Sequence, residues 1–156
     1  MCYLIALGDD NVFSVHPSVA NLFTEPVVGK YMAELGLTYT SETKDVVNDK
    51  LRALTEVEFL KRKWRYSSEV RRYVAPQQVK RLIEMTNWTK KGVNADQISR
   101  DNIDSILREL SLHGKEVYNF WTPKLIKSAK ENISYYPKNS SYEANLHEVC
   151  SMEMFC

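Results

Sequence analysis

The sequence predicts an α+β fold in which a strand-rich first part is followed by a mainly helical second part. Short apolar runs bounded by turn residues occur before residue 67, whereas apolar residues at helical spacing dominate after residue 76. The charge changes along the chain in the same order, because residues 1–58 hold 4 Lys/Arg and 9 Asp/Glu, and residues 59–138 hold 17 and 8. A hydrophobic content of 44% over 156 residues is typical of a globular chain with a core. Such a chain is either one domain or a piece of something larger.

The first expected element is a hairpin within "CYLIALGDDNVFSV", residues 2–15. Gly, Asp and Asn at positions 8–11 are turn residues, and strand-forming apolar runs flank them. Residues 2–7 are apolar on both faces, so we expect this strand to be buried on both sides. Asp9 and Asp10 can both reach the region in front of the turn, where hard oxygen ligands select Mg²⁺ or Mn²⁺. The alternative is that both are solvated turn residues.

A helix is expected next, because residues 24–26 supply a capping hydroxyl, an acid and a proline, and Gly36 is a typical helix end. Residues 37–40 indicate a short strand. Residues 57–60 and 64–66 then indicate two short strands around the basic corner Lys61-Arg62-Lys63.

Three further helices are expected in the basic part. Pro76 opens the first, and the second begins near Ser99 or Asp101 and ends at Gly114. The third covers about 115–132, where Pro123 implies a kink or a break. The polar stretch from residue 137 onward indicates a weakly ordered tail.

Composition excludes several classes of protein. The three cysteines are far apart and form no C-x-x-C pair, which argues against a disulfide framework and against a standard zinc site and favours a reduced protein. No apolar run approaches the roughly 18–20 residues of a membrane span. The chain begins almost inside a strand, so we expect it to be truncated.

Five motifs in one order carry a resemblance to a known family. They are "GDDN" at 8–11, "LGLTYTSETK" at 35–44, "FLKR" at 59–62, "NWTK" at 87–90 and "HGKEVYNFW" at 113–121. This series resembles the RNA-dependent RNA polymerases of the picornavirus-like group of positive-strand RNA viruses. One departure is Leu7, where the family most often has Tyr before the Gly.

The resemblance implies how the chain is divided. Residues 1–58 would be the C-terminal part of the palm subdomain, with a GDD hairpin, a helix and short strands. Residues 59–67 would be the hairpin that joins palm to thumb, residues 68–136 a mainly α-helical thumb, and residues 137–156 the weakly ordered tail. The fingers and first palm motifs of the same polyprotein are expected upstream, so this piece alone is expected to be inactive.

The resemblance also implies catalytic roles. Asp9 would bridge the two catalytic metal ions, Mg²⁺ or Mn²⁺, and Asp10 would be a weaker ligand. Lys44 would protonate the departing pyrophosphate as a general acid; its alternative is a solvated loop lysine. Asp96 and Asp101 repeat the Asp-x4-Asp spacing of the family's first palm motif, but they follow the hairpin and are expected to act near a helix start.

The expected partners are an RNA template, the primer/product duplex and nucleoside triphosphates. The family places Leu60, Lys61 and Arg62 at the 3′ end of the growing strand. Residues 59–91 hold 10 Lys/Arg and 2 Glu, as phosphate contacts to duplex RNA require. The further candidates in this basic segment are Arg65, Arg71, Arg72, Lys80 and Arg81. The expected location is the host cytoplasm, in viral replication complexes.

Two other functions remain open from the residues. One is a non-catalytic, basic RNA-binding protein with a thumb-like surface. The other is a reverse transcriptase, which also uses paired aspartates in a hairpin. The Gly8 that precedes Asp9 and the "FLKR" motif argue against the reverse transcriptase.

Overall fold

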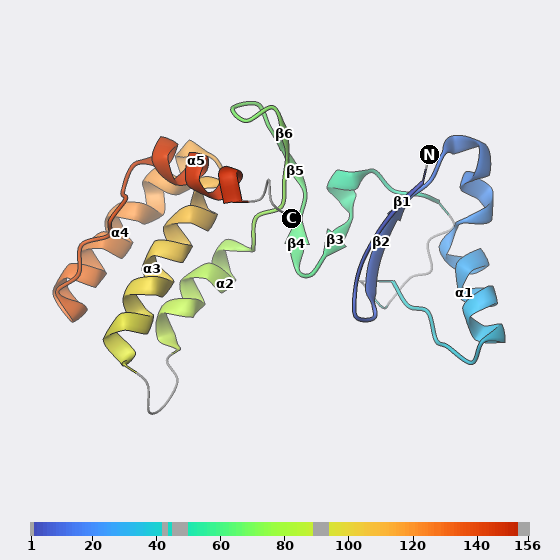
Figure 1. Cartoon of the computed structure of the whole chain (residues 1–156), viewed down its shortest axis with the longest axis horizontal. Helices are drawn as coiled ribbons and strands as arrows, with labels where there is room; N and C mark the ends of the chain where they lie inside the picture. The colour runs from blue at the N-terminus through green and yellow to red at the C-terminus, as the bar shows by residue number, and fades with distance from the viewer. Residues whose placement is uncertain (1, 42–43, 45–49, 89–93, 153–156) are drawn as a thin grey trace. The chain divides into compact units, whose positions relative to one another are not determined.

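A computed structural model describes residues 2–41, 44, 50–88 and 94–152 of the protein. The chain forms two compact units, Met1–Lys63 and Trp64–Cys156 (Figure 1). The division between them lies inside the segment 59–67 that the sequence predicts to be a junction. Strands and helices occur in both parts of the fold, with the long helices in the second unit, as the α+β prediction requires.

The first unit begins with an antiparallel hairpin. Strand β1 (Tyr3–Leu7) pairs with β2 (Asp10–Ser14), from Tyr3 opposite Ser14 to Leu7 opposite Asp10. Two residues therefore form the loop, and the first of them, Gly8, has a φ of 63°. Such a left-handed first loop residue is typical of a type II′ turn, where glycine is strongly preferred. The predicted hairpin is confirmed.

The predicted burial of its first strand is wrong for this chain. The side chains of Tyr3, Leu4, Ile5 and Leu7 are 54–67% exposed. The described residues give this sheet only two strands, so they supply no layer on both faces of β1. On β2, Phe13 makes an edge-to-face contact with Phe23, at 5.9 Å between ring centroids. Burial of an apolar strand depends on partners elsewhere in the fold, which periodicity in the strand does not reveal.

Helix α1 (Glu25–Glu34) follows a 3-10 helix at Pro17–Leu22. It starts at the predicted place, with Thr24 as the N-cap residue and Pro26 in the first turn, but the Thr24 hydroxyl does not make the predicted capping hydrogen bond. Gly36 has a φ of 76° directly after the helix, so the predicted end is confirmed as well. The strand predicted at residues 37–40 does not form.

Two more short hairpins follow. Strand β3 (Glu58–Phe59) pairs with β4 (Arg62–Lys63), and β5 (Arg65–Ser67) pairs with β6 (Arg72–Val74). The predicted pairing of 57–60 with 64–66 around a basic corner is therefore wrong. The β3–β4 turn is tighter than predicted, with two residues, Leu60 and Lys61, and the segment 64–66 lies in β5, which pairs with the later strand β6. Short strands carry too little periodicity to fix their register.

Besides the β5–β6 hairpin, the described residues of the second unit form four α-helices, α2 (Val79–Glu84), α3 (Ala95–Ser111), α4 (Lys115–Ile133) and α5 (Tyr142–Met152). Helix α3 packs against both α4 and α5, and α2 packs against α3 (Figure 1). The residues buried between them are mainly aliphatic. The core includes Leu82, Ile103, Ile106, Leu107, Leu110, Tyr118, Leu125, Ala129, Tyr142 and Leu146.

Helix α3 starts earlier than predicted. Asn94 is its N-cap residue, and the Asn94 Oδ1 accepts a hydrogen bond of 3.3 Å from the backbone N of Gln97. Asp96 lies in the first turn, where a carboxylate favours the positive end of the helix dipole. The helix ends at Ser111, and Gly114, predicted as its end, is instead the N-cap residue of α4.

Helix α4 continues through Pro123, so of the predicted kink or break, the break does not occur. A proline inside a helix removes one backbone hydrogen bond. Thr122 and Leu125 on either side of it are 6% and 7% exposed. Packing of this buried face stabilises the helix across the missing bond.

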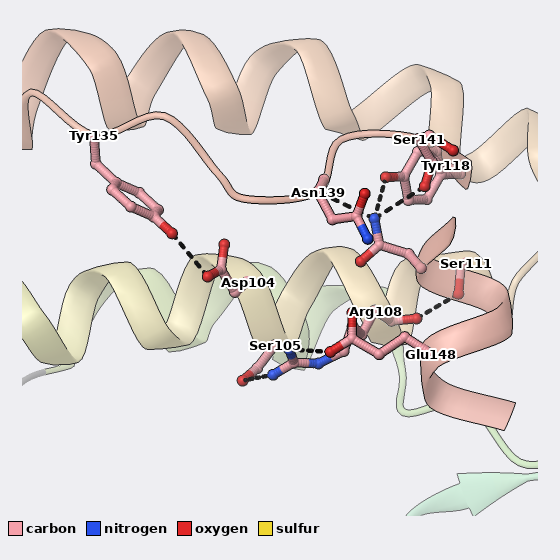
Figure 2. A network of polar contacts seen from close by, with 10 residues as sticks. Asp104, Ser105, Arg108, Ser111, Tyr118, Tyr135, Asn139, Ser141 and Glu148 are labelled. Atoms are coloured by element: carbon pink, nitrogen blue, oxygen red, sulfur yellow. Dashed lines mark hydrogen bonds and ion pairs between the residues drawn. The ribbon is translucent and has the colours of Figure 1, made fainter. Parts of the chain in front are cut away.

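The weakly ordered tail predicted from residue 137 is wrong for residues 142–152, which form α5. Tyr142, Asn145 and Leu146 are 5%, 2% and 7% exposed. Asn145 fastens the segment before α5, because its Nδ2 donates to the Tyr118 hydroxyl at 2.8 Å and to the carbonyls of Asn139 and Ser141 at 3.1 and 3.0 Å. Figure 2 labels these three partners. A polar composition suggested disorder, but these polar groups satisfy one another in the core.

Candidate catalytic hairpin and basic surface

Asp9 and Asp10 lie at the tip of the β1–β2 hairpin, and both are exposed. Asp9 is the second loop residue and Asp10 is the first residue of β2. The Asn11 side-chain amide donates a 3.4 Å hydrogen bond to the Asp9 carbonyl, as turn residues commonly do. The tight turn thus presents two adjacent carboxylates to solvent at one end of a regular ladder.

These carboxylates fit part of the ligand set of a hard divalent cation. Mg²⁺ prefers about six oxygen ligands, and carboxylates with water commonly supply them. Within the described ranges, no group of three or more His, Cys, Asp or Glu side chains is placed to hold a metal ion. Asp9 and Asp10 would therefore need further oxygen ligands to complete a coordination shell.

Lys44 is exposed and has a left-handed backbone, with a φ of 61°. Its backbone N donates a 3.1 Å hydrogen bond to the Ser41 carbonyl. Residues 42–43 and 45–49 around it lie outside the described residues. None of the contacts described for Lys44 joins it to Asp9 or Asp10.

The β3–β4 turn is the predicted contact to the 3′ end. Its two residues, Leu60 and Lys61, have φ values of 52° and 64°. Two left-handed residues in a two-residue loop indicate a type I′ turn, which usually contains Asn and Gly. Holding residues with a Cβ there costs about 1–2 kcal/mol each. Both side chains are exposed, and Arg62 beside them is half-buried.

The other basic candidates fall into two groups. Arg65 and Arg72 are half-buried and bind the backbone of the helical unit: the Arg65 Nη1 donates to the Leu112 carbonyl at 3.1 Å, and the Arg72 Nη2 donates to the Cys150 carbonyl at 2.9 Å. The exposed group contains Arg71, Lys80 and Arg81. Lys80 also lies 3.9 Å from a carboxylate oxygen of Glu84.

Several ionisable groups that sequence reasoning missed fasten the second unit. The His113 Nε2 lies 2.7 Å from the Gln77 carbonyl, and burial lowers the pKa of this imidazole. The Tyr135 hydroxyl donates to Asp104 at 2.7 Å, and burial together with this carboxylate raises the pKa of Tyr135 to about 12 (Figure 2). Arg108 forms a 3.0 Å ion pair with Glu148. No sequence motif marks these pairs, because their partners are distant along the chain.

Among the described helices, none is both long enough and apolar enough to cross a membrane.

Residues 1–149 match the family described as viral RNA-dependent RNA polymerase. The replicase polyprotein of Drosophila C virus (strain EB) is 35% identical over 149 residues, which cover 94% of this chain and 8% of the polyprotein. The RNA1 polyprotein of Grapevine fanleaf virus is 33% identical over 147 residues, or 90% of this chain and 6% of that polyprotein. The chain thus spans less than a tenth of the length of these relatives.

A solved structure shares the fold. The Sicinivirus 3Dpol RNA dependent RNA polymerase matches with a TM-score of 0.65 and 16% sequence identity, over 98% of this chain and 31% of that one. The collinear motifs, the family match and this likeness agree along nearly the whole chain. The chain belongs to the viral RNA-dependent RNA polymerase family.

Proposed function

We propose that this chain is the part of a viral RNA-dependent RNA polymerase that carries catalytic carboxylates and a basic surface for the RNA product. The observation that carries the proposal is the β1–β2 hairpin, whose tight turn presents Asp9 and Asp10 side by side in solvent. In a chain of this family, such a tip is suited to hold divalent ions beside a nucleoside triphosphate and a primer. A palm and thumb arrangement of the two units belongs to the same proposal.

The residues would divide the work by charge. Asp9 would be the principal carboxylate toward two Mg²⁺ or Mn²⁺ ions, and Asp10 a weaker one. Such ions neutralise charge that develops on the transferred phosphoryl group and on the leaving pyrophosphate. Lys44 would donate a proton to that pyrophosphate. Its exposed place on a loop is compatible with reaching a bound substrate.

The basic residues would hold RNA by its backbone. The exposed turn at Leu60 and Lys61, with Arg62 beside it, would support the 3′ end of the growing strand. Arg71, Lys80 and Arg81 would contact product phosphates without reading sequence. Arg65 and Arg72, which bind backbone carbonyls, would contribute their charge and hold the β5–β6 hairpin in place.

The partners and the location follow from this function. The polymerase would act with an RNA template, a primer, nucleoside triphosphates and the upstream fingers and palm segments of a replicase polyprotein. Its place would be a viral replication complex in the host cytoplasm.

The test is an Asp9→Asn substitution in a polymerase that contains this segment, assayed by primer extension with Mg²⁺. The change keeps the size of the side chain and removes the negative charge, so nucleotide incorporation should fall by orders of magnitude.

Asp10→Asn should be milder and shift the preference between Mg²⁺ and Mn²⁺. Lys44→Ala should slow incorporation without abolishing it, since general-acid catalysis is typically worth about 10²–10⁴-fold.

Asn11→Ala is the matched control, because it changes the same turn without removing a carboxylate. It should leave most of the activity, and all four variants should unfold at temperatures close to that of the parent enzyme. Near-normal polymerisation by a folded Asp9→Asn enzyme would mean that the hairpin tip is a turn without a catalytic role. The proposed function would then be wrong, and a non-catalytic RNA-binding protein would be the better-supported function.

A further inference from the structure

The β5–β6 hairpin has one face fixed to the helices of its unit. Ser67 and Val74 on this inner face are 6% and 1% exposed. Arg65 and Arg72, which point the same way, donate hydrogen bonds to the carbonyls of Leu112 and Cys150. At the turn of the hairpin, the Tyr142 hydroxyl of α5 hydrogen-bonds to the carboxylate of Glu69. The hairpin is therefore a rigid support rather than a free arm.

The opposite face carries a pair of tyrosines. Tyr66 and Tyr73 lie directly opposite each other in the two strands, with 5.5 Å between ring centroids and an interplanar angle of 72°. They are 53% and 47% exposed. A cross-strand aromatic pair contributes modestly to hairpin stability, and phenylalanine would do so equally well. The exposed hydroxyls add a hydrogen-bonding capacity that the hairpin itself does not need.

The charge around this pair favours a polyanion. Residues 64–91 hold seven Lys/Arg and two Glu. Arg71 precedes β6 in the turn, is exposed, and keeps a left-handed φ of 52°. Arg65 makes its described hydrogen bond to a neutral carbonyl, so this bond leaves its positive charge in place. An exposed aromatic pair on a rigid, positively charged support is suited to nucleic acid.

We propose that Tyr66 and Tyr73 form a contact platform for the riboses of duplex RNA. The inference rests on the proposed function, which supplies a product duplex as the occupant. Two rings 72° apart cannot both stack flat on neighbouring bases. Their edges and hydroxyls instead suit the wide, shallow minor groove of A-form RNA, which displays 2′-hydroxyls. The platform would thus distinguish an RNA product from DNA without reading its sequence.

The experiment compares the 156-residue chain with a Tyr66→Phe/Tyr73→Phe double variant by fluorescence anisotropy. The two probes are a short RNA duplex and a DNA duplex of the same sequence. Because the rings remain and two hydroxyls are lost, RNA affinity should fall about fivefold for each hydroxyl, and DNA affinity should not change. Tyr136→Phe is the matched control, since this tyrosine is 66% exposed and lies outside the hairpin.

Salt titration separates the platform from the charges around it. The double Phe variant should keep the salt dependence of RNA binding, whereas Arg71→Ala should reduce the slope of log K against log salt by about one. Unfolding temperatures of the Phe variants should match that of the parent chain.

Three results would overturn the platform. They are unchanged RNA affinity in the double variant, an equal loss for RNA and DNA, or a loss of self-association with RNA binding intact, which would assign the pair to contact with a second copy. None of these results changes the outcome expected for primer extension by the Asp9→Asn enzyme, so the tyrosine platform and the catalytic hairpin can be disproved separately.

Discussion

At the scale of single residues, Asn145 connects parts of the helical unit that are distant in the sequence. It is 2% exposed, and its amide donates to the Tyr118 hydroxyl of α4 and to two carbonyls of the segment before α5. The Tyr118 hydroxyl in turn donates to the Ser140 carbonyl at 3.0 Å. Each of these groups would be left without this partner if the amide were removed, and an unsatisfied buried polar group costs about 1–3 kcal/mol.

Asn145→Ala should therefore lower the free energy of unfolding by about 2 kcal/mol or more. Urea unfolding followed by circular dichroism measures the loss. Asn132→Ala is the control: within the described part of the chain its exposed amide bonds to Ser128, one turn earlier in the same helix, and the change should stay within about 0.5 kcal/mol. Equal effects of the two substitutions would contradict a special role for Asn145.

Residue-level prediction from the sequence succeeded for turn chemistry and was limited for side-chain direction. Gly8 and the acidic tip were predictable, because a two-residue loop needs specific backbone angles. The charge count predicted both Arg65 and Arg71 as contacts to RNA phosphates, yet Arg65 binds the Leu112 carbonyl and Arg71 is exposed. The direction of a side chain depends on strand register, which these three-residue strands do not encode locally.

At the scale of elements, helix ends set by local capping were predictable, and elements set by packing were not. The start of α1 and its end at Gly36 follow from propensities of neighbouring residues. Helix α5 could not be found this way, because the polar residues 137–141 before it suggest disorder, whereas hydrogen bonds from Asn145 to Tyr118 of α4 and to this segment hold it in place. Packing likewise explains why α4 runs through Pro123, since Thr122 and Leu125 beside the proline are buried.

The turn between α3 and α4 gives a prediction at this scale. Gly114 caps α4 with a φ of 98°, and a Cβ there would lie 3.2 Å from the Arg65 Nη1. Gly114→Ala should therefore destabilise the protein by about 1–3 kcal/mol, from backbone strain and from displacement of the guanidinium that holds β5. Gly29→Ala should do the reverse, because Gly29 lies inside α1 with no atom within 4 Å of a new Cβ.

The gain expected for Gly29→Ala is about 0.5–1 kcal/mol. Thermal unfolding followed by circular dichroism should show a lower unfolding temperature for Gly114→Ala and a higher one for Gly29→Ala. A neutral Gly114→Ala would mean that the α3–α4 turn relaxes without cost. The contact between Arg65 and this turn would then not fix the β5–β6 hairpin as described.

At the scale of the whole molecule, charge is distributed unevenly along the chain. Residues 1–58, which include the exposed apolar strand β1, carry the acidic excess, and the basic excess is concentrated in residues 59–91, which begin in the first unit and continue into the second. The family could be predicted from the order of short motifs, which is a property of the whole chain. The candidate site could be predicted only in its residue types, because the chain spans 8% of a related polyprotein and two carboxylates do not complete a metal site.

The charge distribution leads to the last prediction, which concerns binding of the 156-residue chain to duplex RNA. Lys61, Arg62, Arg71, Lys80 and Arg81 are exposed or half-buried. If each neutralises one phosphate, log K should fall with log salt at a slope of about −4 to −5, with little dependence on RNA sequence. Fluorescence anisotropy between low and physiological salt measures this slope.

Arg81→Ala should reduce the slope by about one unit. Lys130→Ala, an exposed lysine near the end of α4 and outside the basic segment, should leave it unchanged. A flat salt dependence would mean that the basic segment does not act through phosphates, and the proposed RNA surface would then be wrong even if the hairpin carboxylates are catalytic.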